Sequence, residues 1–422
     1  MCGLFYSKNL TVDLDLLSSI KRRGPENFST CHYKDEFFAH SLLNTIGLAV
    51  EQPIKSTSGT LLYNGSTYNY TDSKFTNDTQ WLADNLDHLL SNTIDVIKSL
   101  RGEYALCYVT DAHVVFAADQ FFVRNLWYYY NKSDKTLAVC SHPKVLIDSF
   151  GAAWPCEENK IYTLDKSNFE LSMVTNTHWN FDQVKNNLDD VFEEFEKSVL
   201  LRWEPKSITT FSSGLDSGAI TCCLENHNID FLSIADVSEE YNQTVEDRIA
   251  RHNSIRVTES YISNQHLNEL FDLYEHPRTK SPGNNTAKHQ TFCDIADSMQ
   301  CKILIYGEGA DELYCDYGHN GKKTRTRSKF GGMFHENLEI MWPWHNHYSG
   351  LFSINSRLDI HMGFNGKEIR MPFQDQHLVQ KWLNTTVELK NKSYKHWIVE
   401  YLKQYDYPYH LDKIGMSGKS FY

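Results

Sequence analysis

Short apolar runs alternate with predicted helices from about residue 190 onward. The run "ITTFSSG" precedes "LDSGAITCCLENH", "IDFLSIADV" precedes "TVEDRIARHN", and "CKILIYGEG" precedes "ADELYCDYG". A repeated order of strand, turn and helix is typical of a doubly wound parallel sheet with helices on both faces. Ligands of such α/β sheets bind at the carboxyl ends of the strands. The turns in this half of the chain are therefore the first places to look for a binding site.

The first half of the chain shows a different pattern. Residues 1 to about 150 contain short strand-like runs separated by turns, such as "EYALCYV" and "HVVFAAD". One helix is expected near 79–98, where leucine and isoleucine recur at helical spacing. These patterns predict an α+β layered domain, with two sheets packed face to face. We place the domain boundary between 1–185 and 186–422, in a stretch with little apolar periodicity.

Composition excludes several classes of protein. Of 422 residues, 41% are hydrophobic and 23% charged, as in a soluble globular protein. The net charge of −13 argues against a nucleic-acid or anionic-membrane binder. No apolar run reaches the ~18 residues of a membrane span, and the start lacks signal-peptide features, so a cytoplasmic location is expected. Ten scattered cysteines without a C-x-x-C pair indicate neither a disulfide framework nor a zinc site.

The stretch "SSGLDS" (212–217) lies between a predicted strand and a predicted helix. Small side chains, a glycine for a tight turn and free backbone N–H groups at a helix start suit a phosphate group. Ser212, Ser213, Gly214 and Ser217 could therefore surround a phosphate, with Asp216 beside them. Serine and glycine before a helix are also ordinary capping residues, so the motif alone leaves both interpretations open.

A second polar cluster follows another predicted strand. The segment "IYGEGADELY" (305–314) supplies Glu308, Asp311 and Glu312. Asp216 and Asp311, at two neighbouring strand ends, would suit a Mg²⁺ ion that carries nucleotide phosphates. The alternative is a solvated acidic helix start, because the helix dipole stabilises acidic side chains there.

Taken together, these motifs resemble those of the glutamine-hydrolysing asparagine synthetases, and further matches extend over most of the chain. Those in the first half resemble the class II glutamine amidotransferase domain of that family, and they are "MCGLF", "RRGPENFS" (22–29), "LLYNGSTYNY" (61–70), "NDT" (77–79), "AADQFFVRNLWYY" (117–129) and "LAVCSHPKVLID" (137–148). Those in the second half resemble its synthetase domain, and they are "GKEIRMPFQDQHLV" (366–379) and "HLDKIGMSGKSF" (410–421). The resemblance implies an Ntn-hydrolase-like sandwich followed by an ATP-pyrophosphatase domain.

The resemblance assigns roles in the amino-terminal half. Removal of Met1 would leave Cys2 with a thiol and an α-amine on one residue, and the amine can activate the sulfur. Asn64 and the amide of Gly65 would form the oxyanion hole, and Asp78 would bind the glutamine amino group. Arg23 and Gly24 match the family's "R-G-P" and are expected to shape the pocket wall.

Two residues depart from the family pattern. Leu42 stands where the family has the arginine that binds the glutamine carboxylate, and Ser66 stands where it has a glutamate. Loss of a partly buried charged partner should weaken glutamine binding by about 2–5 kcal/mol unless another basic residue substitutes.

In the carboxy-terminal half the family activates a carboxylate as an acyl-adenylate. The resemblance assigns pyrophosphate binding to the loop residues named above together with Gly307, Mg²⁺ binding to Asp216 and Asp311, and the base for ammonia to Glu308. Lys419 matches a late lysine of the family, although the matching arginine is Ser417 here. The basic run at 322–329 is interpreted as a solvated loop, with a lid over phosphates as the alternative.

The expected function is therefore ATP-dependent amidation, with aspartate as the first substrate and glutamine or free ammonia as the nitrogen source. ATP and Mg²⁺ are the expected cofactors, small molecules the expected partners, and a homodimer is left open. One alternative is an amidotransferase acting on another acid, such as a sugar acid, peptide or small metabolite. A second alternative is a nucleotide-binding protein without turnover.

Overall fold

The computed structural model describes all residues except 11, 71–76, 211, 228, 236–242, 253–254, 259–285, 319–329, 343–347 and 412–422. The described chain divides into two compact units. Unit 1 contains Met1–His178 and Ser353–Glu368, and unit 2 contains most of the remainder. None of the described helices is long and apolar enough to cross a membrane.

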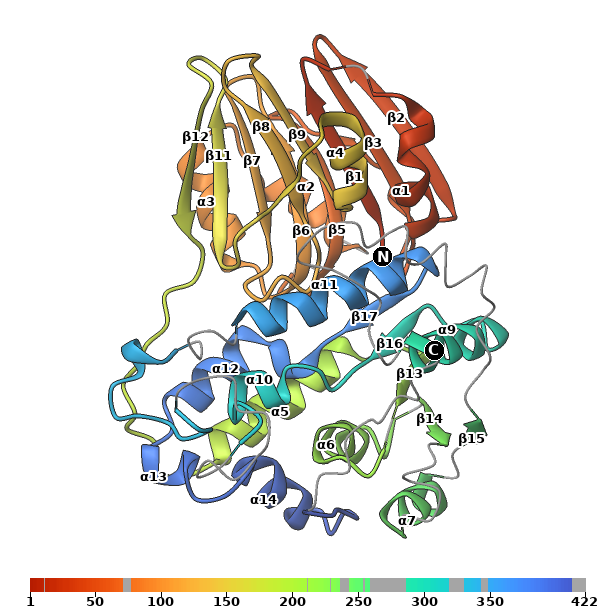
Figure 1. The fold of residues 1–422 in the computed structure, drawn as a ribbon, viewed down its shortest axis with the longest axis vertical. Helices are drawn as coiled ribbons and strands as arrows, with labels where there is room; N and C mark the ends of the chain where they lie inside the picture. Colours follow the sequence, from red (N-terminus) through yellow and green to blue (C-terminus); the bar gives the residue numbers. More distant parts are fainter. Residues whose placement is uncertain are drawn as a thin grey trace. The chain divides into compact units, whose positions relative to one another are not determined.

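Unit 1 is built on two six-stranded sheets in which the described neighbouring strands are antiparallel (Figure 1). The first sheet has the order β10 (Trp154–Pro155), β8 (Trp127–Asn131), β9 (Thr136–Cys140), β1 (Gly3–Lys8), β3 (Glu36–Leu42) and β2 (Asn27–Tyr33). The second has the order β12 (Glu170–Thr175), β11 (Lys160–Asp165), β7 (His113–Ala118), β6 (Gly102–Val109), β5 (Thr60–Thr67) and β4 (Ile54–Lys55).

Aromatic side chains fill the space between the two sheets. Phe116 on β7 lies 5.6 Å from Tyr128 on β8, measured between ring centroids, and Tyr128 lies 5.3 Å from Tyr162 on β11. These contacts join strands of different sheets, so the sheets pack face to face as the sequence predicts.

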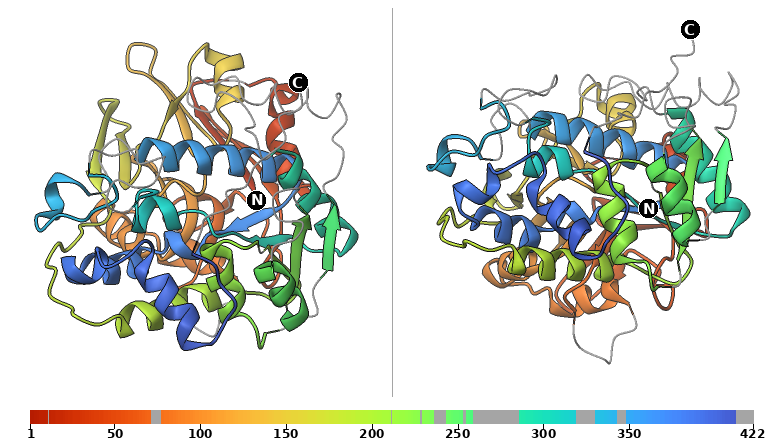
Figure 2. Two further views of the ribbon diagram at one scale, coloured as in Figure 1. Left: turned by 60° about the horizontal axis from the view of Figure 1, so that its bottom comes forward. Right: turned by 90° about the horizontal axis from the view of Figure 1, so that it is seen from below.

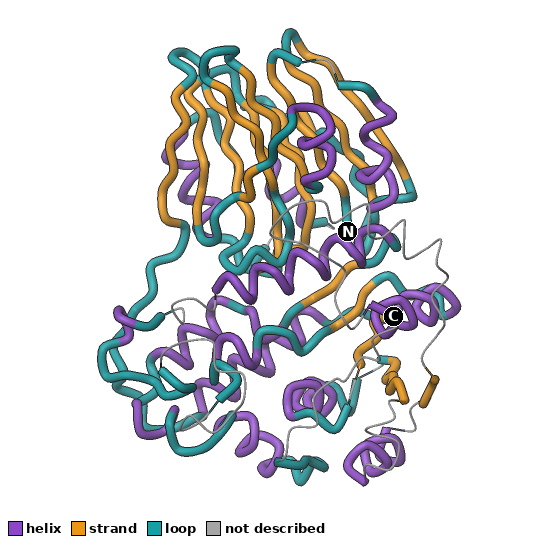
Figure 3. Tube along the Cα trace, viewed as in Figure 1, coloured by secondary structure: helices purple, strands orange, loops and turns teal. Residues whose placement is uncertain are grey.

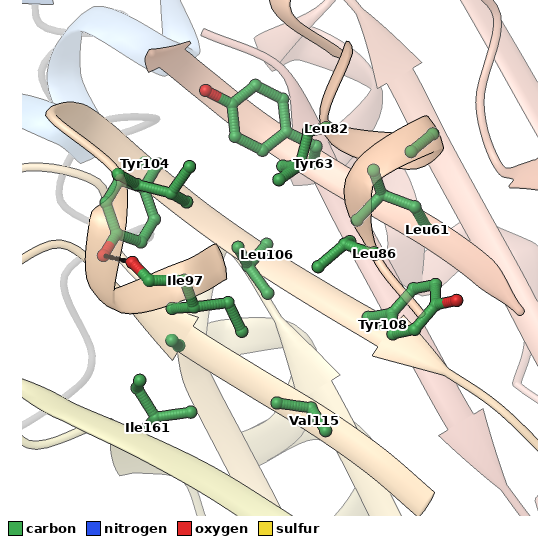
Figure 4. Packing of buried hydrophobic residues seen from close by; sticks show 13 residues of the cluster. Leu61, Tyr63, Leu82, Leu86, Ile97, Tyr104, Leu106, Tyr108, Val115 and Ile161 are labelled. Atoms are coloured by element: carbon green, nitrogen blue, oxygen red, sulfur yellow. Dashed lines mark hydrogen bonds between the residues drawn. The ribbon is translucent and has the colours of Figure 1, made fainter. Parts of the chain in front are cut away.

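Two helices cover the second sheet of unit 1, α2 (Asp78–Asn85) and α3 (Leu90–Ser99). Leu82, Leu86 and Ile97 pack there against strand residues that include Leu106 and Tyr108 (Figure 4). Burial of each such side chain contributes roughly 1.5–3 kcal/mol of stability.

The sequence predicts one helix at 79–98, and that prediction is wrong because the chain breaks between α2 and α3. Leu86 has an extended backbone with ψ of 141°. The backbone oxygen of Asp87 accepts a hydrogen bond from the Thr93 hydroxyl at 2.8 Å, and its side chain accepts one from Asn92. These local polar contacts compete with helix continuation.

Unit 1 also contains a helical segment that is distant in sequence. Part of α11 (Tyr348–Phe364) belongs to this unit, along with η1 (Leu14–Leu17), α1 (Ser18–Arg23) and α4 (Pro143–Phe150). The Asn355 side chain donates to the backbone oxygen of Phe121 at 2.9 Å, and the Asn125 side chain donates to that of Ser356 at 3.1 Å. These buried hydrogen bonds hold the segment against the sandwich.

Unit 2 contains a five-stranded sheet, of which β13 is the central strand (Figures 1 and 2). The order is β15 (Ile255–Thr258), β14 (Asp230–Ala235), β13 (Ser207–Thr210), β16 (Ile303–Ile305) and β17 (Glu368–Arg370). β13 runs parallel to both β14 and β16, and β14 runs parallel to β15.

Helices surround this sheet, and Figure 3 shows that helix predominates over strand in this part of the chain. Helix α6 packs on β13, α7 on β14, and α5 on α6 and α12. The helices are α5 (Asp189–Arg202), α6 (Leu215–Cys223), α7 (Gln243–His252), α9 (Thr286–Ser298), α10 (Ala310–Tyr314), η2 (Leu338–Ile340), η3 (Pro372–Gln374), α12 (Gln376–Leu383), α13 (Val387–Lys390) and α14 (His396–Gln404).

The predicted fold class is confirmed. An α+β sandwich is followed by an α/β unit with a parallel sheet. The domain boundary at 185/186 stays a prediction.

Candidate active site

The two motifs of unit 2 meet at one edge of the parallel sheet. Ser207 of β13 pairs with Ile303 of β16, and Thr209 pairs with Ile305. The strands run in the same direction, so their carboxyl ends lie side by side and both following loops start at that edge. The closeness is visible at Gly307, where an added Cβ atom would lie 3.2 Å from the Cβ atom of Asp216. Absence of a side chain at Gly307 lets the second loop approach the first turn of α6.

The first loop is closed by its own serine hydroxyls. The Ser217 hydroxyl accepts from the backbone N–H of Ser212 at 3.1 Å, and the Ser212 hydroxyl accepts from that of Gly214 at 3.1 Å. The two hydroxyl oxygens lie 3.3 Å apart. Gly214 is the N-cap residue of α6, so the loop delivers the chain directly to a helix start. This is the geometry in which backbone N–H groups and the helix dipole favour an anion.

Asp216 and Asp311 converge on one cation, Lys395. The Lys395 ammonium lies 2.5 Å from Asp216 Oδ2 and 3.0 Å from Asp311 Oδ1. Only 2% of the lysine side chain is exposed. The Tyr394 hydroxyl donates to the same Asp311 oxygen at 2.6 Å. The structure therefore brings together the two predicted carboxylates and adds a buried lysine that the motifs did not include.

Lys395 keeps its charge in this environment. Burial opposes the charged form, but the neighbouring carboxylates of Asp216 and Asp311 outweigh it and raise the pKa of Lys395. The residue precedes α14 with a left-handed backbone, φ of 49°. Its sequence surroundings, "NKSYKHWIV", contain no phosphate-loop pattern, so no local motif indicates a role for this lysine. Lys395 reaches the carboxyl ends of β13 and β16 through the tertiary fold alone.

The donor set at this edge fits Mg²⁺. Carboxylate oxygens are the ligands that the ion prefers, and one or two carboxylates with substrate phosphates commonly hold it. No cluster of three or more metal-ligating side chains occurs among the residues that the structure describes. An ion at Asp216 and Asp311 would therefore depend on phosphate oxygens for further ligands, and it would compete with the Lys395 ammonium.

The remaining predicted residues of this half are only partly described. Glu308 is half-buried, and its backbone oxygen accepts from the Gln374 side chain at 3.2 Å. Ser213 is buried at the loop. Glu312 is buried and its carboxylate accepts from the backbone N–H of Gly309, so it stabilises the start of α10. Lys419 and the basic run at 322–329 lie outside the described residues.

In unit 1 a small hollow lies beside Cys2. Its volume is about 20 Å³, which is close to the ~10–15 Å³ that one water needs. The lining residues are Cys2, Leu42, Leu43, Asn44, Thr45, Ile46, Val50, Gln52, Tyr63, Gly65, Ser66, Asn77, Asp78 and Thr79.

The Cys2 thiol is held by backbone groups at the wall of this hollow. Its sulfur lies 3.4 Å from the backbone nitrogen and 3.6 Å from the backbone oxygen of Leu43. Burial raises the pKa of the thiol. The terminal amine belongs to Met1, donates to the Lys367 backbone oxygen at 2.8 Å, and has its pKa lowered by burial to about 5. Activation of the sulfur by the amine of Cys2 itself requires loss of Met1 and stays a prediction.

The two residues assigned to the oxyanion hole differ in position. Gly65 lines the hollow, whereas Asn64 does not. A Cβ atom at Gly65 would lie 2.1 Å from the backbone oxygen of Glu103, so only glycine fits there. Asn64 is buried on β5, and neither polar atom of its side chain has a hydrogen-bond partner within the part of the chain that the structure describes. Unpaired buried amides are rare, and a ligand or water commonly satisfies them.

Asp78 places one buried carboxylate at the hollow, at the first position of α2. One of its oxygens accepts from the backbone N–H of Thr67 at 2.9 Å and from the Tyr63 hydroxyl at 3.2 Å. Burial raises the pKa of Asp78 from 3.8 to about 6, although these hydrogen bonds oppose the change. The carboxylate is therefore charged at neutral pH and could bind an ammonium group.

The two departures from the family pattern lie on the same wall. Leu42 lines the hollow, and none of the described residues that line it is lysine, arginine or histidine. The Ser66 hydroxyl donates to Glu368 Oε1 at 2.9 Å, and the Thr45 hydroxyl donates to Glu368 Oε2 at 3.0 Å. Glu368 therefore supplies a buried carboxylate next to the position where the family glutamate is missing. Sequence reasoning could not find it because it lies 302 residues from Ser66.

Arg23 has a supporting role that the sequence did not reveal. Its guanidinium donates to the backbone oxygen of Cys2 at 3.0 Å, and it forms two hydrogen bonds with the Asp359 carboxylate, at 2.9 and 3.1 Å. Neither Arg23 nor Gly24 lines the hollow. Arg23 therefore fixes the main chain that carries the thiol, through a buried partner on α11.

Comparisons with known proteins divide the chain at nearly the same place as the two motif sets. Residues 1–186 match the model of the glutamine amidotransferase domain, and residues 191–353 match that of asparagine synthase. A protein of Methanocaldococcus jannaschii, named putative asparagine synthetase [glutamine-hydrolyzing] 1, is 25% identical over 403 residues. That match covers 83% of this chain and 70% of the relative.

Two solved structures are also similar at 15% identity. Glutamine phosphoribosylpyrophosphate amidotransferase from B. subtilis, in complex with ADP and GMP, gives a TM-score of 0.35, and the match covers 50% of this chain and 60% of that one. An allosteric regulatory enzyme of purine biosynthesis gives 0.33, with 55% and 64% covered. The chain thus spans less than two thirds of either structure.

The two family models account for both halves of the chain in order, and the fold and the two motif sets agree with them. The chain therefore combines a glutamine amidotransferase domain with an asparagine synthase domain, as its resemblance to the glutamine-hydrolysing asparagine synthetases implies, and it is a glutamine-dependent carbon–nitrogen ligase.

Proposed function

We propose that the protein converts aspartate to asparagine through a β-aspartyl-adenylate, with ammonia released from glutamine or taken from solution. The observation that carries this proposal is the cluster of Asp216, Asp311 and Lys395 at the joined ends of β13 and β16. A buried, charged lysine beside a phosphate-type loop suits a reaction that develops negative charge on phosphate and carbonyl oxygens.

The first step joins the acid to the nucleotide. A carboxylate oxygen attacks the α-phosphorus of ATP, the bond to the β-phosphate oxygen breaks, and pyrophosphate leaves with the electron pair. The loop at 212–217 would bind the departing phosphates through its N–H groups and hydroxyls. Mg²⁺ bound to Asp216 and Asp311 would neutralise phosphate charge when present.

The second step forms the amide. Ammonia attacks the acyl carbon, AMP leaves, and one proton of the attacking nitrogen must be removed. Glu308 is the proposed acceptor of that proton, and Lys395 would stabilise the oxyanion of the tetrahedral intermediate. Lys419 remains a second candidate for this electrostatic role.

The amidotransferase half would supply the ammonia. The Cys2 thiolate attacks the glutamine side-chain amide, ammonia leaves, and water hydrolyses the thioester to glutamate. The Gly65 amide and the Asn64 side chain are the proposed oxyanion donors, and Asp78 would bind the substrate ammonium.

A panel of acids tests the proposal. Purified protein with ATP, Mg²⁺ and ammonia should release pyrophosphate and AMP in equal amounts, and asparagine should form when aspartate is the acid. Amide formation only from another acid, such as a sugar acid or a peptide, would replace aspartate but keep the chemistry. Absence of pyrophosphate release with every acid would favour a nucleotide-binding protein without turnover.

A further inference from the structure

A second buried cation, Arg248 of α7, lies behind the phosphate-type loop of unit 2. Its guanidinium donates to the backbone oxygen of Ser212, and to that of Gly214 at 3.0 Å. The side chain is fully buried. These contacts join α7 to the loop that precedes α6, although 34 residues separate Arg248 from Gly214.

The contacts determine the direction of two peptide groups. In a planar trans peptide the C=O and the following N–H point in opposite directions. The oxygens of Ser212 and Gly214 point toward Arg248, so the N–H groups of Ser213 and Leu215 point away from it. Arg248 therefore directs two donors of the loop to the side opposite the guanidinium. A fixed positive charge behind those donors also strengthens their attraction for an anion.

A glycine makes this arrangement possible. A Cβ atom at Gly218 would lie 2.2 Å from one terminal guanidinium nitrogen of Arg248 and 2.7 Å from its central carbon. Gly218 lies in the first turn of α6, so any larger residue would displace the guanidinium from the loop.

Arg248 also contacts the chain segment that leads to the carboxyl terminus. Its Nε atom donates to the Pro408 backbone oxygen at 3.0 Å, and the guanidinium lies 5.4 Å from the centre of the Tyr407 ring. The neighbouring Arg251 lies 5.2 Å from the same ring, but it donates hydrogen bonds to Glu225 and to the backbone oxygens of Tyr405 and Asp406. Arg248 contacts the loop, whereas Arg251 provides a natural comparison on the same helix.

We propose that Arg248 is the positioning residue of the pyrophosphate-binding loop, and that Gly218 is the space it requires. The inference rests on the proposed function of that loop. Arg248 acts through the backbone of Ser212 and Gly214 and does not touch the phosphates. Its loss should weaken binding of inorganic pyrophosphate and of ATP and leave the affinity for the acceptor acid unchanged.

Calorimetric titration with inorganic pyrophosphate and Mg²⁺ tests the proposal on the full chain. Arg248→Met should raise the pyrophosphate Kd at least tenfold, because both loop donors lose their orientation. Arg248→Lys should give an intermediate loss, since a lysine ammonium is a point charge without the planar fork of arginine. Gly218→Ala should weaken binding in the same direction while leaving Arg248 in the sequence.

Arg251→Met is the matched control, and its pyrophosphate Kd should equal that of the wild type. Equal losses in Arg251→Met and Arg248→Met would overturn the inference, because packing around Tyr407 would then explain both. A wild-type Kd in Arg248→Met would also overturn it. Thermal unfolding of each variant identifies losses caused by misfolding, and Arg248→Lys keeps the test valid if the methionine variant does not fold.

The KM for the acceptor acid distinguishes a positioning role of Arg248 from general damage to the active site. In steady state, Arg248→Met should raise the KM for ATP and leave the KM for the acid within twofold of wild type. Failure of the proposed function is recognised separately, because wild-type protein would then neither bind pyrophosphate nor release it from ATP. If wild type does both and Arg248→Met is unchanged, only the role of Arg248 is wrong.

Discussion

The two sites of the molecule differ in how completely their polar groups are paired. At the sheet edge of unit 2 the carboxylates of Asp216 and Asp311 already hold the Lys395 ammonium between them. In unit 1 the buried Asn64 amide, next to Gly65 of the hollow, has no hydrogen-bond partner among the described residues, and burial raises the pKa of the Cys2 thiol. The site of unit 2 therefore has its charged groups paired before substrate binds. In unit 1, the Asn64 amide would be paired by a ligand, and the Cys2 amine would become free on removal of Met1.

This difference predicts how substitutions in each site should affect activity. A preassembled charge cluster fails when one member is removed, because the others are left buried and unpaired. A small hollow with the buried carboxylate of Asp78 at its wall is limited instead by how well it binds its ligand. Substitutions in unit 2 should therefore abolish turnover, and those in unit 1 should mainly alter the use of glutamine.

The largest effect is expected for Asp216→Asn. It removes one of the two carboxylates that hold the Lys395 ammonium, and breaking a buried ion pair costs about 3–5 kcal/mol, which corresponds to roughly 200- to 5,000-fold if the whole cost falls on the rate. Pyrophosphate release should fall by that factor with ammonia and with glutamine alike. Asp230→Asn, at the exposed start of β14, is the control and should be near normal. Near-normal turnover in Asp216→Asn would show that the cluster is structural.

Cys2→Ala should remove one activity and keep the other. Glutamine-dependent product should disappear because the nucleophile is lost, and ammonia-dependent product should remain. Cys31→Ala, a half-buried cysteine on β2, should change neither rate. The intact mass of the purified protein shows whether Met1 has been removed. Equal loss of both activities in Cys2→Ala would contradict the division of labour between the halves.

Local motifs predicted much of unit 2 because its chemistry follows strand ends. The alternation of strand and helix predicts that β13 and β16 are parallel and that Asp216 lies near Asp311, as observed. Lys395 could not be predicted this way. Its place depends on how α14 packs on α6, which no local pattern encodes.

In unit 1, local sequence predicts even fewer of the contacts around the site. The strands were predictable from their apolar pattern, and the break at Leu86 was not, because hydrogen bonds of Asp87 stop the helix despite suitable leucine spacing. Glu368 beside Ser66 and Asp359 beside Arg23 join residues more than 300 positions apart. Such long-range pairs follow from tertiary packing and leave no trace in local sequence.

Asp78→Asn should raise the stability of the folded protein at pH 7 and weaken glutamine binding. The folded-state pKa of Asp78, about 6, is above its ordinary value of 3.8. The folded state then binds more protons than the unfolded state between these values, so stability falls as pH rises from about 4 to 6. One pKa unit is about 1.4 kcal/mol, so the loss is roughly 3 kcal/mol at most. The asparagine variant should lack this fall and melt at a higher temperature at pH 7.

The same variant should bind glutamine more weakly, because the ammonium loses its charged partner. A tenfold rise in the glutamine KM, by the usual strength of a charge-assisted hydrogen bond, is the expected scale. Asp84→Asn, exposed on the same helix, should alter neither the pH profile of melting nor the KM. Unchanged pH dependence in Asp78→Asn would mean that other groups titrate in this range.

The smallest effect is expected from adding a cation to the hollow, since none of its described lining residues carries one. Leu42→Arg would place a guanidinium at the wall, where it can pair with the glutamine carboxylate, and should lower the glutamine KM about tenfold. The ammonia reaction should hardly change, since the gain is binding shared by ground and transition states. Leu42→Met keeps the volume without the charge and should leave the glutamine KM unaltered.

Saturation of the wild type at micromolar glutamine would contradict this reasoning. Arg22 and Lys21 do not line the hollow and instead lie over the Phe364 and Phe28 rings, so another cation would have to be found.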